Sequence, residues 1–265
     1  MASIGPTAHY TGHVWARNGL SHPELDTSGG RLLHAVTNAA LLPVRLLGGL
    51  SIDAFLLARH KAIDDRLEEA IADGRVGQVL EIAAGLSPRG WRFTERHPEL
   101  VYVEADLPDM TPRKRAALDR IGRPPGHRVV EIDALAADGP QSLAAVVESE
   151  LDPALGTAVI TEGLLNYLPQ DAVEDLWRRI APLAEVYLSD LFVQEDSPPL
   201  VGRAFSGVLA AFVRGGVTLH YADADQARAA LRAAGFAGVS VKRASSERGA
   251  DRVRIVQAAG APTAT

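Results

Sequence analysis

Acidic residues stand at or near the ends of five apolar runs in this sequence. In chain order these acids are Glu81, Glu104 with Asp106, Asp133, Glu162 and Asp190. If the runs are parallel strands, their carboxyl ends meet at one edge of a sheet, where open α/β folds bind ligands. An acid at such a position can instead cap the following helix. Glu81 and Glu162 fit that alternative poorly, because they lie between apolar residues, where an unpaired acid is costly to bury.

The kind of ligand follows from these acids and from the loop after the first run. Residues 79–90, VLEIAAGLSPRG, lack the glycines of a dinucleotide-binding loop, so no phosphate cradle of the NAD or ATP type is expected. An acid-rich edge favours hydroxyl groups, amines and positive charge. S-adenosylmethionine (SAM) offers a ribose, an exocyclic amine, an ammonium and a sulfonium, and its carboxylate needs a cation.

Arg59 is the candidate for that cation. It lies on the apolar stripe of a helix predicted over residues 51–73. A charge on a buried stripe needs an anionic partner, which the ligand's carboxylate would supply. Two alternatives are an internal ion pair, with Asp64 or Glu81, and a side chain that extends to solvent.

The elements that must position these residues alternate between strands and helices. Seven apolar runs are predicted as strands: 78–83, 100–106, 128–133, 157–163, 185–192, 239–244 and 252–258. Five segments between them are predicted as helices: 88–96, 112–121, 139–150, 169–183 and 223–235. This order predicts an α/β fold with a mostly parallel seven-stranded sheet and helices on both faces. The loop 245–251 is too short for a crossover, so one antiparallel strand comes from a C-terminal hairpin.

The region before the first strand has a different composition. Residues 1–30 are polar and turn-rich, which predicts an irregular lead-in that lies on the domain. Helices are predicted over about 31–48 and 51–73, so that 1–73 forms an N-terminal helical cap. Residues 74–258 form the core, interrupted by an insertion at 193–222 that would serve as a lid or substrate wall. One domain over 1–265 is the simplest organisation.

Composition limits the function classes. The chain has 265 residues, 47% of them hydrophobic, a net charge of −6 and no cysteine. Because the chain has no excess of basic residues, we expect no nucleic-acid or membrane partner. No cysteine ligand or disulfide is available, no spacing indicates a metal site, and no targeting or spanning segment is visible. We therefore expect a cytoplasmic protein, for which a homodimer stays open.

Four motifs together resemble a known family. LLARHKAID, VLEIAAGLSPRGWRF, YVEADLPDMTPRKRAAL and VITEGLLNYLP occur in the order and at the spacing of the leucine carboxyl methyltransferase-like branch of the class I SAM-dependent methyltransferases. The resemblance runs from about Leu56 to Ala258. It implies a Rossmann-like methyltransferase fold, SAM as cofactor and S-adenosylhomocysteine as product.

The resemblance also implies roles for the residues that match the motifs. Arg59 would hold the SAM carboxylate and Glu162, with Gly163, the amino group. Asp106 would take the ribose hydroxyls, with Glu104 as the alternative. The resemblance further implies that Glu81 and the turn formed by Ala83, Ala84 and Gly85 contact the methionine half of SAM. Asp133 and Ala134 would contact the edge of its adenine ring.

The first loop departs from the family pattern. Where the family has G-A-G-L-D-T-R, this chain has AAGLSPR, residues 83–89. Ala83 replaces the first glycine, which is tolerable only if its φ is negative. Ser87 and Pro88 replace the Asp-Thr pair, so the polar contact of that aspartate is in doubt. The sequence gives no role to Arg89.

The acceptor is less well defined by the sequence. A carboxylate acceptor is ionised and needs no base, whereas a hydroxyl needs one. His220 is the candidate base, with Tyr167 orienting the substrate; His220 would otherwise be a capping or surface residue. Four residues of the insertion are further candidates for substrate contacts, with solvated surface or core packing as alternatives: Arg203, Arg214, Phe205 and Phe212. His9, Tyr10, His13 and Trp15 would fold over the pocket, or belong to a mobile start.

Three hypotheses follow. The first is a SAM-dependent O-methyltransferase acting on a carboxylate or hydroxyl of a small molecule, of the kind made in secondary metabolism, or of a peptide. The second is a SAM-binding protein with a non-methylating or regulatory task. The third, an NAD(P)-dependent oxidoreductase, is disfavoured by the missing glycines.

Overall fold

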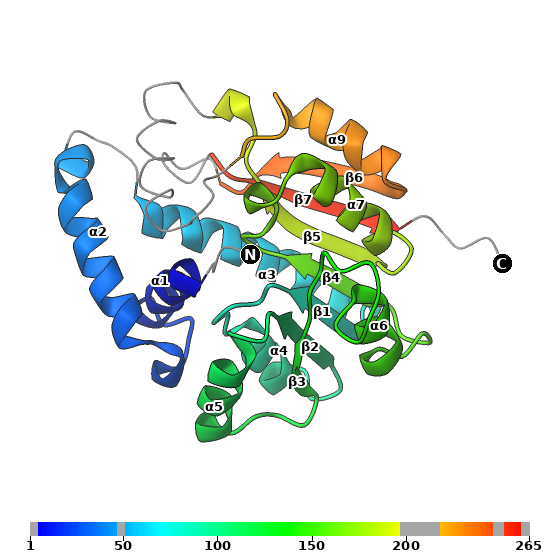
Figure 1. Cartoon of the computed structure of the whole chain (residues 1–265), viewed down its shortest axis with the longest axis horizontal. Coiled ribbons are helices and arrows are strands. Elements are labelled where there is room, and N and C mark those ends of the chain that lie inside the picture. Colours follow the sequence, from blue (N-terminus) through cyan, green and yellow to red (C-terminus); the bar gives the residue numbers. More distant parts are fainter. Residues whose placement is uncertain (1–4, 47–50, 197–217, 246–251, 261–265) are drawn as a thin grey trace.

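The central sheet has seven strands in the order β3-β2-β1-β4-β5-β7-β6. The computed structural model describes residues 5–46, 51–196, 218–245 and 252–260. The strands are β1 (Gln78–Ile82), β2 (Val101–Asp106), β3 (His127–Glu131), β4 (Thr157–Thr161), β5 (Val186–Leu191), β6 (Phe236–Arg243) and β7 (Arg254–Gly260). Only β7 runs against its neighbours β5 and β6. The predicted sheet, with one antiparallel strand from a C-terminal hairpin, is confirmed (Figure 1).

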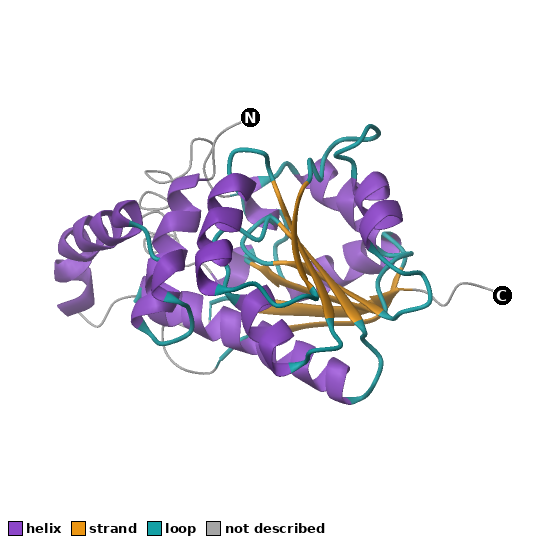
Figure 2. Ribbon diagram, turned by 90° about the horizontal axis from the view of Figure 1, so that it is seen from below, coloured by secondary structure: helices purple, strands orange, loops and turns teal. Residues whose placement is uncertain are grey.

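Helices cover both faces of this sheet, as Figure 2 shows. They are α3 (Ile52–Ala72), α4 (Arg89–Arg96), α5 (Thr111–Ile121), α6 (Leu143–Glu150), α7 (Gln170–Ile180) and α9 (Ala224–Ala233), with short 3-10 turns η2 (Leu165–Tyr167) and η3 (Gln194–Asp196). These helices lie where the sequence predicts them. Most of the predicted insertion, with Arg203, Phe205, Phe212 and Arg214, lies outside the described residues. Within the described segments, no helix has the length and apolarity needed to cross a membrane.

The expected irregular lead-in over residues 1–30 is wrong. The described part of it forms α1 (Gly5–Arg17) and η1 (Pro23–Leu25), and α2 (Ser28–Leu46) begins within it. Tyr10, Val14 and Trp15 are buried. The local sequence, rich in Gly, Pro and His, disfavours a helix over these residues. Packing of the buried face of α1 against α2 and α3 stabilises the helix.

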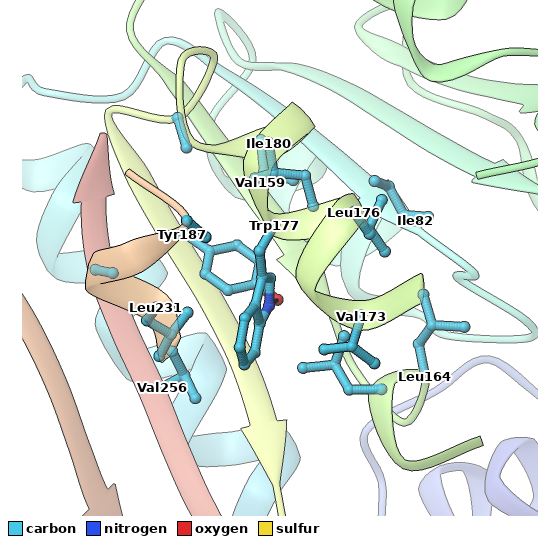
Figure 3. Packing of buried hydrophobic residues seen from close by; sticks show 14 of the residues in the cluster. Ile82, Val159, Leu164, Val173, Leu176, Trp177, Ile180, Tyr187, Leu231 and Val256 are labelled. Carbon is cyan, nitrogen blue, oxygen red and sulfur yellow. Dashed lines mark hydrogen bonds between the residues drawn. The ribbon is translucent and has the colours of Figure 1, made fainter. Parts of the chain in front are cut away.

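The largest apolar cluster fixes the ends of β4 and β5. Trp177 of α7 is fully buried between the sheet and α9 (Figure 3). Its Nε1 donates to the Tyr187 hydroxyl at 3.0 Å, which is 2.7 Å from Thr161 Oγ1. Because the polar tips are paired, the aromatic rings are buried without an unsatisfied group. Thr161 and Tyr187 belong to the strands that carry Glu162 and Asp190 to the edge.

Candidate active site

The loop after β1 turns sharply at two residues. Ala83 has φ +57° and Gly85 has φ +53°, both left-handed. The expectation of a negative φ at Ala83 is therefore wrong. The turn allows the Gly85 N–H to donate to Asp106 Oδ2 at 2.6 Å, while the Ala83 N–H donates to the Ala105 carbonyl at 2.8 Å. A side chain in this conformation costs about 1 kcal/mol, which these contacts to β2 offset.

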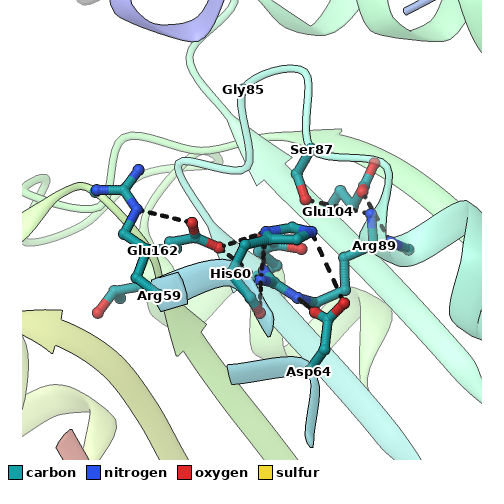
Figure 4. Close-up of polar contacts among 12 residues, drawn as sticks. Arg59, His60, Asp64, Gly85, Ser87, Arg89, Glu104 and Glu162 are labelled. Carbon is teal, nitrogen blue, oxygen red and sulfur yellow. Dashed lines mark hydrogen bonds and ion pairs between the residues drawn. The ribbon is translucent and has the colours of Figure 1, made fainter. Parts of the chain in front are cut away.

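Arg89, at the start of α4, is the centre of a buried ion-pair network (Figure 4). Its side chain is completely buried. Nε donates to Asp64 Oδ1 at 2.6 Å, Nη1 to Glu81 Oε1 at 2.6 Å, and Nη2 to Glu162 Oε2 at 2.5 Å. These acids come from α3, from β1 and from the residue after β4. One guanidinium thus ties three elements together behind the first loop.

Tyr102 and His60 also belong to this network. The Tyr102 hydroxyl donates to Glu81 Oε2 at 2.6 Å, so both oxygens of Glu81 are bound by protein groups. His60 Nδ1 lies 2.9 Å from Glu162 Oε2, and the His60 ring packs on Trp15 of α1 at 4.7 Å. Because both of its oxygens are paired, Glu81 influences the first loop through its ion pair with Arg89.

Arg59 binds Glu162 from the opposite side. Its Nε donates to Glu162 Oε1 at 2.9 Å and its Nη1 to Asp190 Oδ2 at 3.0 Å. Arg59 thus forms an internal ion pair, the alternative to a ligand contact named above, but its partners are Glu162 and Asp190 and not Asp64 or Glu81. The guanidinium lies against Gly163, where a Cβ would come within 3.0 Å of Nη2. The Gly163 N–H donates to Asp190 Oδ1 at 2.6 Å.

The two acids bound to Arg59 respond differently to burial. Burial acts to raise the pKa of Glu162, but His60, Arg89 and Arg59 outweigh it and hold that pKa well below its ordinary value. Burial raises the pKa of Asp190, and Arg59 offsets this only in part. Glu162 is thus a firmly ionised group, whereas Asp190 keeps its charge through Arg59.

Asp106 and Glu104 lie on the same strand but in different surroundings. Asp106 ends β2 and is partly exposed; it accepts from Gly85 N and, at 2.7 Å, from Leu107 N. Glu104 is fully buried and lies 2.7 Å from Lys114 Nζ and 3.0 Å from His127 Nε2. Of the two predicted ribose ligands, only Asp106 is positioned at the edge of the sheet.

Asp133 and Ala134 follow β3 at the same edge. Both are partly exposed. The neighbouring Ile132 N–H donates to the Asp106 carbonyl at 2.9 Å, which brings the ends of β2 and β3 together. Asp133 Oδ1 accepts from Leu135 N at 3.0 Å. The predicted adenine-edge residues therefore adjoin the predicted ribose ligand.

A cavity that is partly open to solvent lies beside Arg59. Its floor includes Arg59, Gly163 and Asp190. Its walls come from α1, α3, η2 and the end of β5, and they are mostly apolar: Tyr10, Ile52, Phe55, Leu56, Leu164, Tyr167 and Phe192. The rings of Phe55 and Phe192 stack at 5.0 Å. The cavity combines a charged floor at the carboxyl ends of β4 and β5 with an aromatic wall.

The two predicted catalytic residues are placed differently relative to this cavity. Tyr167 lines it, and burial raises the pKa of its hydroxyl, with Arg59 opposing and Asp190 adding to the effect. His220 is not among the lining residues; a ring nitrogen lies 3.2 Å from the Leu165 carbonyl. Asp223, not His220, caps α9. Among the described residues, no group of three or more His, Asp and Glu is arranged to hold a metal ion.

Comparison with known sequences now decides the family. The sequence model of the leucine carboxyl methyltransferase family matches residues 45–181, more than half of the chain. The chain belongs to that family. A relative from Mycolicibacterium smegmatis, named "putative S-adenosyl-L-methionine-dependent methyltransferase", is 38% identical over 158 residues, which cover 59% of this chain and 51% of the relative. This leucine carboxyl methyltransferase family member spans about half of the length of the curated relatives that it matches.

Solved structures share the fold of this family member. A DUF574 family protein from Streptomyces avermitilis aligns with a TM-score of 0.68 at 14% identity, covering 96% of this chain and 97% of that one. Magnesium protoporphyrin IX methyltransferase from Synechocystis, with bound S-adenosylhomocysteine, aligns with a TM-score of 0.51 at 15% identity, covering 78% and 86%. At these identities the likeness establishes the class I methyltransferase fold alone.

The roles of three residues of this leucine carboxyl methyltransferase family member were not predicted from sequence, although Asp64 was named as a possible partner of Arg59. Arg89, His60 and Asp64 all belong to the buried network. His60 and Asp64 follow Arg59 on the buried side of α3 at helical spacing, which is the one signal that could have found them. In the loop, Ser87 Oγ accepts from Arg89 N at 3.3 Å, and Pro88 precedes α4 without a side-chain cap. Ser87 and Pro88 thus start the helix that begins with Arg89.

Proposed function

We propose that this protein is a SAM-dependent O-methyltransferase that acts on a hydroxyl or carboxylate of a small, largely apolar molecule or peptide. The observation that carries the proposal is the pairing of Arg59, which lines the cavity, with Glu162, the residue after β4 and next to the cavity-lining Gly163. A cation and an acid placed side by side match the carboxylate and ammonium of an amino acid. Family membership supports this proposal independently.

The residues present fit SAM. Arg59 offers guanidinium N–H groups for its carboxylate and Glu162 an anionic oxygen for its ammonium. Asp106 at the end of β2 would take the ribose hydroxyls, and Asp133 with Ala134 the adenine edge. The left-handed turn at Ala83 and Gly85 brings backbone close to the edge, and Gly85 has no Cβ to obstruct it. When bound, the cofactor supplies a methyl group activated by a positively charged sulfur.

The protein's own contribution to the transfer would be alignment and exclusion of water. Phe55 and Phe192 form a flat wall against which an apolar acceptor can pack. Tyr167 is placed in the same cavity to donate a hydrogen bond to the acceptor oxygen. These placements support Tyr167 as the residue that orients the acceptor; the proposal assigns no role to His220.

We further propose that residues 1–73 act as a cap on the core at 74–258. Ala8 of α1 packs so closely on the first loop that a Cβ at Gly85 would come within 3.1 Å of it. His9 Nε2 lies 3.1 Å from Arg113 Nη1 on α5, and the Tyr10 hydroxyl donates to Asp53 Oδ1 at 3.1 Å. α1 therefore spans the edge from α5 to α3, which supports a role in covering bound cofactor.

Calorimetry tests the cofactor. SAM and S-adenosylhomocysteine are expected to bind, and NAD is not. Asp106→Ala is expected to weaken binding about 10- to 150-fold, since a lost hydrogen bond involving a charged group costs about 1.5–3 kcal/mol. Asp109→Ala, at an exposed position nearby, is the matched control and should leave affinity unchanged. Failure of SAM to bind, together with no effect of Asp106→Ala, would refute the proposal.

Transfer of a labelled methyl group from SAM tests the reaction. With apolar hydroxylic and carboxylic acceptors, label should appear in products; base-labile label identifies an ester and base-stable label an ether. Binding of SAM without transfer to any acceptor would favour a protein that uses SAM for another task.

A further inference from the structure

Both carboxylate-binding edges of Arg59 are already engaged. A guanidinium binds a carboxylate best through two parallel N–H groups on one edge. Nε, on one edge, donates to Glu162 Oε1, and Nη1, on the other, donates to Asp190 Oδ2. A ligand carboxylate can therefore bind through two N–H groups only if one of these acids gives way.

The two acids are held with unequal strength. Glu162 is clamped through its other oxygen by Arg89, at 2.5 Å, and by His60, at 2.9 Å. Asp190 is held through its other oxygen by one neutral donor, the Gly163 N–H. Asp190 also lines the cavity. The acid that is easier to displace is thus the one that faces the space where the ligand would enter.

We propose that Asp190 competes with the cofactor's carboxylate for Arg59, and that it releases the arginine and takes up a proton when the cofactor binds. This inference rests on the proposed function. Asp190 thereby lowers the affinity for ligands with an amino-acid group, because only the fraction of molecules with a free Arg59 edge is competent to bind. Ligands without an amino-acid group bind without displacing Asp190 from Arg59.

The proton follows from the surroundings of Asp190. The charged and titratable groups that interact with it are Arg59 from α3, Glu162 after β4, Tyr167 of η2 and Tyr187 of β5. Burial already raises the pKa of Asp190 while Arg59 is bound. Once the ligand's carboxylate has replaced Asp190 on Arg59, the buried Asp190 carboxylate adjoins that carboxylate and Glu162, while the ligand's ammonium is paired with Glu162, so Asp190 takes one proton from solvent.

The test is calorimetry with two ligands, S-adenosylhomocysteine, which carries the amino-acid group, and 5′-methylthioadenosine, which lacks it. Asp190→Asn is expected to bind S-adenosylhomocysteine about tenfold more tightly than the wild type, with 5′-methylthioadenosine unchanged. Asp196→Asn is the matched control, since Asp196 is also a buried aspartate paired with arginines, Arg243 and Arg254. It should change neither affinity.

The outcomes separate this inference from the proposed function. If the wild type binds S-adenosylhomocysteine but Asp190→Asn binds it equally or more weakly, Asp190 orients Arg59 and does not compete; the inference fails and the function stands. If S-adenosylhomocysteine binds to neither protein, both fail. If Asp190→Asn does not fold, the wild type is titrated calorimetrically with S-adenosylhomocysteine in buffers of different ionisation enthalpy, which measures the number of protons taken up on binding. Proton uptake on binding is expected, and its absence overturns the inference.

Discussion

Arg89 and Arg59 bind opposite sides of the same carboxylate, yet their surroundings differ. Arg89 has no exposed surface and holds acids from three elements, Asp64, Glu81 and Glu162. Arg59 shares Glu162 but borders a cavity and holds the displaceable Asp190. We propose that Arg89 maintains the site and that Arg59 exchanges Asp190 for a ligand. Residue type and burial alone do not distinguish them; the adjoining space does.

Removal of Arg89 should have the largest effect on stability. Arg89→Met leaves three acids buried without their common partner, so the free energy of unfolding should fall by about 3–5 kcal/mol. Denaturant unfolding measures the change. Arg96→Met, in the same helix but in a half-exposed ion pair with Glu68, should cost about 0.5 kcal/mol. Similar losses in both variants would mean that Arg89 does not maintain the site.

Removal of Arg59 should act mainly on binding. In Arg59→Met, Glu162 keeps Arg89 and His60, and Asp190 takes up a proton, so stability should fall less than in Arg89→Met. Affinity for S-adenosylhomocysteine should fall about 100-fold, the loss of a charged hydrogen-bonded pair. Calorimetry and unfolding on the same samples give both values. A variant that loses stability but keeps its affinity would reverse the roles assigned to the two arginines.

Glu162, which joins the two arginines, should govern stability in acid. Its pKa is held well below the ordinary value in the folded protein. Its contribution is therefore fully present above the unfolded-state pKa of about 4.3 and is lost as pH falls through the lower folded-state pKa. Glu162→Gln should be less stable at pH 7 and should show a shallower loss of unfolding free energy below about pH 5. Parallel curves for variant and wild type would contradict this assignment.

Relief of strain in the loop that leads to Arg89 should have the smallest effect. Ala83→Gly removes a side chain from a left-handed conformation and should raise the free energy of unfolding by about 1 kcal/mol at most. Ala84→Gly is the matched control, because Ala84 is not among the described residues with positive φ, and it should lower stability by about 0.5 kcal/mol. Destabilisation by both changes would show that Ala83 is not strained.

Local patterns were sufficient to predict the sheet and its helices. Short apolar runs alternating with segments of helical pattern predicted all seven strands, and the short loop at 245–251 predicted the reversed strand. α1 was not predictable in this way, because its helix depends on packing against α2 and α3. The left-handed φ of Ala83 was also missed, since it follows from the contacts of the loop with β2.

The site was predictable in composition but not in pairing. Arg59, Glu162 and Asp106 could be singled out from their positions on predicted elements. The partners of Arg59 could not, because Glu162 and Asp190 are about a hundred residues or more away in the chain and meet it only through the order of strands. Arg89 stands at the start of the predicted helix 88–96, where nothing local indicates that it is buried against three acids.

A crystal structure of the wild-type complex with S-adenosylhomocysteine tests the division between the two arginines most directly. We predict that the ligand's carboxylate lies on Arg59, that Asp190 has lost its contact with Arg59, and that Arg89 keeps Asp64, Glu81 and Glu162 within hydrogen-bond distance. A ligand bound away from Arg59, or an Arg89 displaced from its acids, would contradict the account.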